Sequence, residues 1–280
     1  MTAKPTTPLV TLNDKRRMPQ LGIGMWQVPG EKVAPVLNAA IEAGYRSIDT
    51  ASAYENETAI GEALRALSIP REQLFITTKL WNSDHGAARA PKALEQSLAR
   101  LGLDYVDLYL IHWPVPTRNE YTDTWKALVQ LRADGRAKSI GVSNFMPAHL
   151  RRIVDATGVV PAVNQVELHP HFPQAALRAF HAERGIITES WSPLAQGGDL
   201  LKDPVVGKIA AKHKRTPAQV VLRWHVELGL VAIPKSVTPA RIAENADIFK
   251  FSLDPGDKAA FATLNKGHRI GPSPDTFAMM

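Results

Sequence analysis

The chain contains no cysteine among its 280 residues. Disulfide bonds, thiolate nucleophiles and cysteine-ligated metal sites are therefore excluded, and we predict no metal centre. Long apolar runs are also missing. No segment approaches the roughly 18 consecutive apolar residues of a membrane-spanning helix, and the N-terminal stretch MTAKPTTPLV lacks the apolar core of a signal peptide. These absences lead us to expect a cytoplasmic protein that does not act in a membrane.

Strong charge of one sign is absent as well. The formal net charge is +6, and the longest basic cluster is Lys15, Arg16 and Arg17, which is typical of a solvated turn. Because no long basic run is present, we expect no nucleic-acid partner. The modest excess of positive charge is explained more economically by an anionic small ligand.

The hydrophobic pattern predicts the fold. Apolar residues make up 45% of the chain, and short apolar runs alternate with amphipathic stretches from end to end. Several runs are rich in β-branched residues without strict alternation, as expected for parallel strands that are buried on both faces. The length also suits one barrel of roughly 250 residues. We therefore predict an α/β (β/α)8 TIM barrel, with strands at residues 21–25, 46–49, 74–79, 106–112, 138–143, 162–167, 185–191 and 230–235.

Helix boundaries and loops support this prediction. Glycines follow the last apolar position of four helical patterns, which is where a left-handed helix stop is common. Two Thr-Pro pairs, at 216–217 and 238–239, predict capped helix starts. No shift of composition divides the chain, so we expect a single domain over residues 1–280. A short hairpin is expected at 10–22, and long loops at 113–121, 192–203 and after 266 are expected on the rim. The four glycines are Gly44, Gly102, Gly135 and Gly158.

Three of the predicted strands end at polar, ionisable residues. The run YRSIDTASAY contains Asp49 and Tyr54, LFITTKLW contains Lys79, and YVDLYLIHWP contains His112. Because such barrels build their sites at the carboxyl ends of the strands, these four side chains are expected to lie together.

An acid, a phenol, an amine and an imidazole suit reduction of a carbonyl group. Tyr54 is expected to protonate the carbonyl oxygen, although a free phenol has a pKa of about 10. The ammonium group of Lys79 is expected to lower that pKa, and Asp49 to keep Lys79 charged. His112 is expected to orient the carbonyl. No side chain supplies a hydride, so a nicotinamide cofactor is required.

Each residue also has a simpler interpretation. Asp49 alone would suit a helix cap or an ion pair, Tyr54 a half-buried phenol, and His112 a core histidine. A different reaction is also compatible with the sequence. Lys79 lies at the end of a barrel strand, where a lysine can form a Schiff base in an aldolase or another lyase.

The cofactor site is predicted near the end of the chain. Gly22 and Gly24 form a GxG pair, but Gln27 occupies the third glycine position of a dinucleotide fingerprint. In IPKSVTPARIAEN, Lys235 and Ser236 precede a predicted helix, and Arg241 lies within its first turn. Oriented amides and two cations would bind a phosphate there. A capped helix with surface basic residues is the alternative.

Four longer motifs resemble those of a known family. GYRSIDTASAYENE, LDYVDLYLIHWP, GVSNF and IPKS are similar to motifs of the aldo-keto reductases, and nearly the whole chain resembles the prokaryotic 2,5-diketo-D-gluconate reductases within that family. The resemblance implies a catalytic tetrad of Asp49, Tyr54, Lys79 and His112, with NADPH as the cofactor.

The resemblance also implies binding residues. Ser143, Asn144 and Gln165 would hold the nicotinamide carboxamide, Trp191 would stack on the ring, and Leu194, Gln196 and Gly197 would line the pyrophosphate. Lys235, Ser236 and Arg241, with Val237 beside them, would bind the 2′-phosphate, and Glu244 and Asn245 the adenine. Trp26, Trp81, His112 and Trp113 would form the substrate pocket, although the tryptophans would also serve as ordinary packing residues.

The family further implies a monomer that acts on a small carbonyl compound. Keto-sugar acids, dicarbonyls, small aldehydes and α-keto esters are all candidate substrates. Because some relatives are binding subunits, a non-catalytic nicotinamide-binding role is a further alternative.

Overall fold

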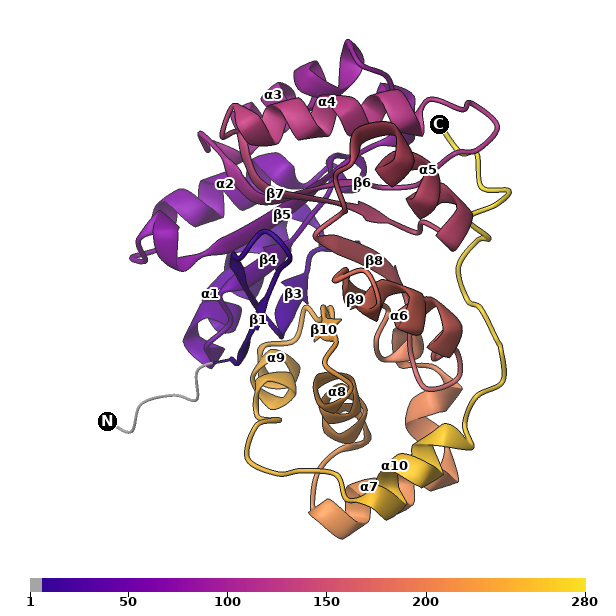
Figure 1. The fold of residues 1–280 in the computed structure, drawn as a ribbon. Helices are drawn as coiled ribbons and strands as arrows, with labels where there is room; N and C mark the ends of the chain where they lie inside the picture. Colours follow the sequence, from indigo (N-terminus) through magenta and orange to yellow (C-terminus); the bar gives the residue numbers. More distant parts are fainter. Residues whose placement is uncertain (1–6) are drawn as a thin grey trace.

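Eight parallel strands form the barrel in the computed structural model, which describes residues 7–280 (Figure 1). Hydrogen-bonded neighbours follow chain order from β3 to β10. A parallel bridge between Leu21 and Ala232 joins the two ends of this series, so the predicted barrel is confirmed. The strands are β3 (Gly22–Gly24), β4 (Ser47–Asp49), β5 (Phe75–Leu80), β6 (Val106–Ile111), β7 (Ala137–Ser143), β8 (Val163–Glu167), β9 (Ile187–Trp191) and β10 (Val231–Ala232).

Helices surround the strands and bury their outer faces. Apolar side chains fill the barrel at the hairpin end, whereas buried polar side chains lie toward the carboxyl ends of the strands. Every residue of β5 and of β8 is buried, which explains why their sequences do not alternate between apolar and polar residues. The helices are α1 (Gly30–Ala43), α2 (Glu57–Ala66), α3 (Arg89–Leu101), α4 (Tyr121–Ala133), α5 (Pro147–Thr157), α6 (Ala175–Ala182), α7 (Pro204–His213), α8 (Pro217–Glu227), α9 (Pro239–Ala246) and α10 (Pro255–Ala262).

Most predicted helix ends lie where the sequence places them. The glycines after α1, α3 and α5 are left-handed C-caps, and Gly135 lies one residue beyond the C-cap of α4 with φ of 78°. Thr216 caps α8 by accepting a hydrogen bond from the Gln219 amide. Thr238 lies at the N-cap of α9 but makes no side-chain cap bond. Its own amide donates instead to Ser236 Oγ at 3.1 Å.

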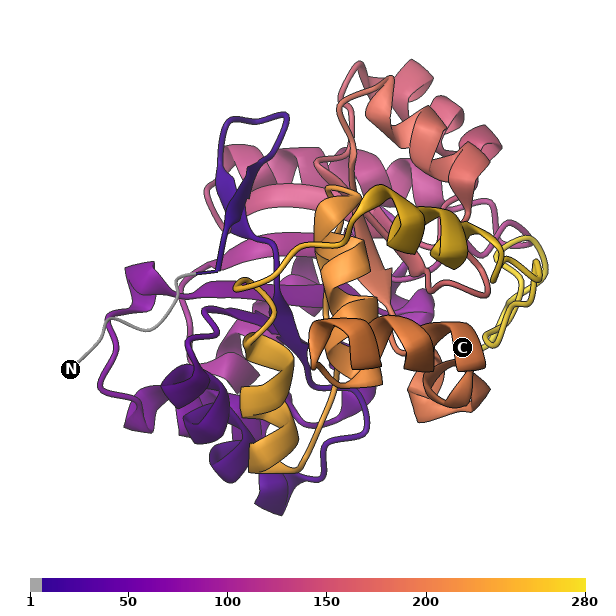
Figure 2. The same cartoon turned by 90° about the horizontal axis from the view of Figure 1, so that it is seen from below.

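The predicted N-terminal hairpin closes one end of the barrel. Strands β1 (Leu9–Thr11) and β2 (Arg17–Pro19) pair antiparallel, and the turn contains Asn13 and Asp14. Figure 2 shows the hairpin in indigo. Leu12 and Met18 belong to the core cluster that fills this end. The first six residues, part of the stretch that lacks a signal-peptide pattern, lie outside the described residues.

The C-terminal tail after α10 crosses the opposite end of the barrel. It passes the end of β8, where the Ile270 and Gly271 amides donate to the Glu167 carboxylate at 2.5 and 2.9 Å. It ends beside β5 and β6, where Asn82 Nδ2 donates to the Met279 carbonyl oxygen at 2.7 Å. The hairpin and the C-terminal tail thus cover opposite ends of the barrel. In residues 7–280, no helix is both long enough and apolar enough to span a bilayer.

Candidate active site

The four predicted catalytic side chains lie together at the carboxyl ends of the strands. Asp49 ends β4, Lys79 is the penultimate residue of β5, and His112 directly follows β6. Tyr54 ends the 3-10 helix η1 (Ser52–Tyr54) that follows β4. Lys79 Nζ lies 2.6 Å from Asp49 Oδ1 and 3.1 Å from the Tyr54 hydroxyl oxygen. The cluster predicted from three strand ends is present in the fold.

The loop that carries Tyr54 is held by buried polar residues directly after it. Asn56 Nδ2 donates to the carbonyl oxygens of Met25 and Val28 at 2.8 and 3.1 Å, while Thr50 Oγ1 donates to Asn56 Oδ1. Glu57 is buried as well and accepts from Thr78 Oγ1 at 2.6 Å. These bonds fix the position of the phenol relative to the barrel.

Lys79 is fully buried, and its ammonium group has no free donor. Its three N–H groups reach Asp49 Oδ1, the Thr50 carbonyl oxygen and the Tyr54 hydroxyl oxygen. Burial acts to lower the pKa of Lys79, but the Asp49 carboxylate and the Tyr54 oxygen outweigh it and raise the pKa above its usual value. Lys79 is therefore a fixed cation at neutral pH.

The pKa of Tyr54 departs from the sequence-based expectation. Burial raises this pKa most, the Lys79 ammonium lowers it, and the Asp49 carboxylate raises it again, so the net pKa lies above 10. The expected net lowering is therefore wrong, because the ammonium offsets only part of the desolvation cost. Since Lys79 donates to the phenol oxygen, the phenolic proton remains free to be donated elsewhere.

His112 is a neutral imidazole at this site. Burial, and then the Lys79 charge, hold its pKa well below the usual value. Its ring lies 5.8 Å from the Tyr54 ring and 5.1 Å from the Trp81 ring. The buried Nδ1 atom has no hydrogen-bond partner within the described part of the chain. A neutral ring in this position offers one hydrogen bond to a carbonyl oxygen beside Tyr54.

A cavity of about 1640 Å³ opens over these residues. Of all the predicted site residues, Lys79 alone does not line it, because it lies beneath Tyr54. The cavity is continuous from the tetrad to α9. The predicted residues that line it are Trp26, Asp49, Tyr54, Trp81, His112, Trp113, Ser143, Asn144, Gln165, Trp191, Leu194, Gln196, Gly197, Lys235, Ser236, Val237, Arg241, Glu244 and Asn245.

Beside the tetrad, the residues predicted to hold the nicotinamide form a connected polar group. Ser143 Oγ donates to the Gln165 carbonyl oxygen at 2.8 Å, and Asn144 Nδ2 donates to the His112 carbonyl oxygen at 3.0 Å. Trp191 Nε1 donates to Asn144 Oδ1 at 2.8 Å. The N–H and O–H donors of Ser143, Asn144 and Gln165 are all engaged, so this edge of the cavity offers acceptor oxygens, which fit the N–H groups of a carboxamide.

The tail packs closely against Trp191. A Cβ atom at Gly271 would lie 2.5 Å from the indole ring, so only glycine fits at this crossing. The backbone bonds from Ile270 and Gly271 to Glu167 hold the tail in this place.

The other end of the cavity carries unpaired positive charge. Lys235 and Arg241 are exposed, and neither forms an ion pair within residues 7–280. Arg241 lies in the first turn of α9, whose N-terminal amides face the same region. The strand ends approach closely here, because a Cβ atom at Gly24 would lie 3.0 Å from the Ile233 carbonyl oxygen. Two free cations at a helix N-terminus fit a phosphate group.

Aromatic rings form the wall of the cavity beside His112. Trp113 lies 4.4 Å from the Phe277 ring and Trp81 lies 6.4 Å from it, measured between ring centroids. Trp26 is 44% exposed at the cavity rim, so packing does not account for it. Trp81 and Trp113 serve packing and the cavity wall together.

Several cavity residues escaped the sequence prediction. The Thr-Pro pair at 216–217 indicated a helix start but not that this start would line the cavity. The tail residues have no spacing pattern that would place them near His112. Glu189 lies buried below the cavity and belongs to a strand that was predicted, yet no motif marked it. The missed residues that line the cavity include Thr216, Pro217, Ala218, Phe277 and Met279.

Comparisons with known proteins agree with this geometry. A family model described as "Aldo/keto reductase family" matches residues 19–266. An "Aldo-keto reductase" of Mycolicibacterium smegmatis is 55% identical, over 97% of this chain and 98% of that protein. "Methylglyoxal reductase DkgA" of Escherichia coli K12 is 53% identical, over 98% and 99%. Among solved structures, the Gox0644 D53A mutant in complex with NADPH is 50% identical with a TM-score of 0.94, over 98% of this chain and 99% of that one.

Proposed function

The chain belongs to the aldo/keto reductase family, and we propose that it reduces small carbonyl compounds with NADPH, using Tyr54 as the general acid. The observation that carries this proposal is the buried hydrogen-bonded series from Asp49 through Lys79 to Tyr54 at the base of the cavity. At its far end the same cavity carries Lys235 and Arg241, which form no ion pair among the described residues. A Gox0644 variant that is 50% identical was solved with NADPH, which supports this choice of cofactor.

The residues divide the reaction among them. NADPH, when bound, supplies the hydride. Tyr54 donates its free proton to the substrate oxygen, and Lys79 stabilises the phenolate that remains. His112, kept neutral by burial and by Lys79, donates a hydrogen bond to the same oxygen and orients it. Asp49 holds Lys79 charged and fixes its direction.

The cofactor is held at both ends of the cavity. Ser143, Asn144 and Gln165 would bind the carboxamide, and Trp191 would stack on the ring. Lys235 and Arg241 would neutralise the 2′-phosphate, so we expect a preference for NADPH over NADH. Between these ends, Leu194, Gln196 and Gly197 would line the pyrophosphate of the cofactor. Glu244 and Asn245 would lie beside the adenine.

The substrate is a small carbonyl compound that fits between His112 and the rings of Trp81, Trp113 and Phe277. Several relatives are named methylglyoxal reductases, and dicarbonyls are compact enough for such a wall. Keto-sugar acids such as 2,5-diketo-D-gluconate, small aldehydes and α-keto esters belong to the same proposal.

The hydrogen bonds of Lys79 argue against Schiff-base chemistry. A nucleophilic amine needs a free lone pair, whereas Lys79 is fully buried and donates three hydrogen bonds. Borohydride trapping of a substrate adduct on Lys79 would restore the lyase hypothesis.

The test is a carbonyl panel assayed by NADPH oxidation, with NADH measured in parallel. We expect turnover of dicarbonyls and of at least one keto-sugar acid, with kcat/KM higher for NADPH. NADPH binding without turnover of any carbonyl would instead favour the non-catalytic binding role.

A further inference from the structure

Glu189 is a fully buried carboxyl group that the proposed reaction does not use. It lies in β9, directly opposite Gln165 of β8 in the parallel register. Gln165 Nε2 donates to Glu189 Oε2 at 2.9 Å, and Glu189 Oε1 has no partner within the described residues. A buried carboxyl group with a single partner is costly, so its presence calls for an explanation.

Gln165 connects Glu189 with the tetrad. The same Nε2 atom donates to Asp49 Oδ2 at 2.7 Å. Since β4 and β8 lie four strands apart in a ring of eight, this bond spans the barrel. The whole series runs from Glu189 through Gln165 and Asp49 to Lys79.

These two bonds determine which way the Gln165 amide points. A side-chain amide has two N–H donors and one oxygen acceptor. Asp49 takes one N–H and Glu189 takes the other, so the nitrogen lies between two carboxyl groups. Reversing the amide would place its oxygen against both acceptors. The oxygen is therefore directed away from them, and it accepts no hydrogen bond from residues 7–280.

We propose that Glu189 is a positioning residue that fixes the Gln165 amide so that its oxygen accepts a hydrogen bond from the carboxamide N–H of the nicotinamide. This inference rests on the proposed function. Asp49 alone would satisfy one N–H and leave the amide free to turn about its terminal torsion. Glu189 supplies the second point that fixes the amide plane.

The charge state of Glu189 agrees with this role. Burial, and then the Asp49 charge, raise the pKa of Glu189 to about 8. At neutral pH most of the group is uncharged, so Glu189 accepts the amide bond without placing a second negative charge beside Asp49 and Tyr54.

The test compares two ligands of the intact protein. NADPH contacts both ends of the cavity, whereas adenosine 2′,5′-bisphosphate contacts only the end near Arg241. We expect Glu189→Leu to weaken NADPH binding roughly tenfold, as loss of one oriented hydrogen bond implies, and to change the bisphosphate Kd by less than about twofold. Glu189→Gln keeps an oxygen acceptor and should restore most of the NADPH affinity. Isothermal titration calorimetry measures the Kd of each ligand for the wild type and for both variants.

Controls separate positioning from damage to the strand. Ser190→Ala removes a buried hydroxyl without a partner from the same strand, and it should change neither Kd. Glu189→Thr, which is too short to reach Gln165, is measured beside Glu189→Leu so that the result does not depend on one variant folding. In a double-mutant cycle, Glu189→Leu should change the Kd for NADPH much less when Gln165 has already been replaced by Leu.

Two results would overturn the inference. One is an equal loss of affinity for both ligands in the Leu and Thr variants, which indicates general damage. The other is additivity of the Gln165 and Glu189 changes. A wild-type protein that binds NADPH but reduces no carbonyl would refute the proposed function instead. The Kd values of the variants would still test the role of Glu189 in that case.

Discussion

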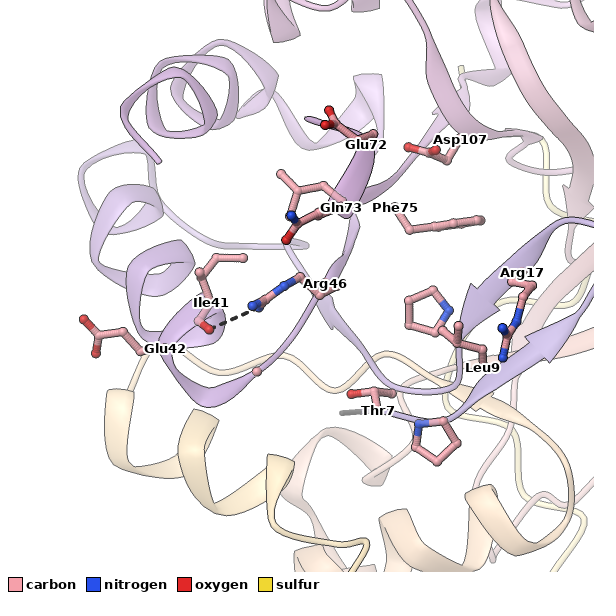
Figure 3. A pocket seen from close by; sticks show the side chains of 14 residues that line it. Thr7, Leu9, Arg17, Ile41, Glu42, Arg46, Glu72, Gln73, Phe75 and Asp107 are labelled. Carbon is pink, nitrogen blue, oxygen red and sulfur yellow. Dashed lines mark hydrogen bonds between the residues drawn. The ribbon is translucent and has the colours of Figure 1, made fainter. Parts of the chain in front are cut away.

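The two ends of the barrel each carry a hollow, and they differ in how their polar groups are satisfied. At the carboxyl ends of the strands, a cavity of about 1640 Å³ lies over an acid, a phenol, an amine and an imidazole that converge within hydrogen-bonding distance or ring contact. At the amino ends, a hollow of about 910 Å³ lies between the hairpin, α1 and the starts of β5 and β6 (Figure 3).

The second hollow contains charged residues that are already engaged. Arg46 donates to the carbonyl oxygen of Ile41 at 3.3 Å (Figure 3) and to that of Tyr45 at 2.7 Å. Asp107 pairs with Arg71 at 2.7 Å and accepts from the Ile76 amide at 2.8 Å. Such groups support the fold. Arg17, Glu42 and Glu72 line the same hollow without an ion pair in residues 7–280, but they come from separate elements and do not converge on one point. The comparison teaches that a catalytic site needs polar groups whose last hydrogen bond is left for a ligand, and a hollow alone does not make one.

The largest expected difference between the two ends comes from removing one hydroxyl at each. Tyr54→Phe removes the proposed general acid and should lower kcat by about 10²- to 10⁴-fold, with NADPH binding changed less than about twofold. Tyr45→Phe is the matched control, because that buried hydroxyl has no partner among the described residues and its residue lies two positions before β4. Stopped-flow turnover and fluorescence titration of NADPH measure both. Retention of most of kcat in Tyr54→Phe would refute the acid assignment.

A second pair of variants compares cations at the two ends. Arg241→Ala should raise KM for NADPH roughly 10- to 100-fold, as loss of a charged hydrogen bond implies, and leave KM for NADH nearly unchanged. Arg17→Ala removes an exposed cation beside the other hollow and should affect neither cofactor. Equal losses for NADPH and NADH in Arg241→Ala would remove the argument for the 2′-phosphate.

A third variant perturbs the hollow at the amino ends of the strands. Arg71→Met leaves the Asp107 carboxylate without its cation and should lower the free energy of unfolding by about 1–3 kcal/mol. Because the pair lies far from the tetrad, kcat/KM should stay within about twofold of wild type. Urea denaturation and steady-state kinetics at a temperature where the variant is folded make the comparison. A large fall in kcat/KM of the folded variant would contradict the division of roles between the ends.

The smallest expected effect concerns stability against pH at the carboxyl end. The folded-state pKa of Glu189 is about 8, whereas the unfolded chain titrates near the ordinary value of about 4.5. Between these pH values the unfolded state loses the proton and the folded state keeps it, so rising pH destabilises the wild type. Glu189→Gln has no proton to lose. The Tm of this variant relative to wild type should therefore rise from pH 5 to pH 8, by roughly 2 °C or more. A difference that is constant with pH would show that Glu189 does not titrate in this range.

Local patterns in the sequence were sufficient for the barrel and for the position of the tetrad. Each strand is a short run that is buried on both faces, and each proposed catalytic residue lies at or just after the end of such a run. Parallel strands bring their carboxyl ends to one rim, so the chain order of Asp49, Tyr54, Lys79 and His112 also predicts their proximity. The hairpin and the glycine helix ends follow from equally local rules.

Only the tertiary structure decided the electrostatics and the long-range contacts. The pKa of Tyr54 rises because burial outweighs Lys79, and burial depends on every element around the phenol. Gln165 bonds to Asp49 and to Glu189, and Phe277 packs on Trp113. These contacts join residues with no shared local pattern. Short-range periodicity determines which residues form strands and where those strands end. Desolvation and the matching of donors to acceptors are properties of the packed chain, so they become visible only when the barrel is closed.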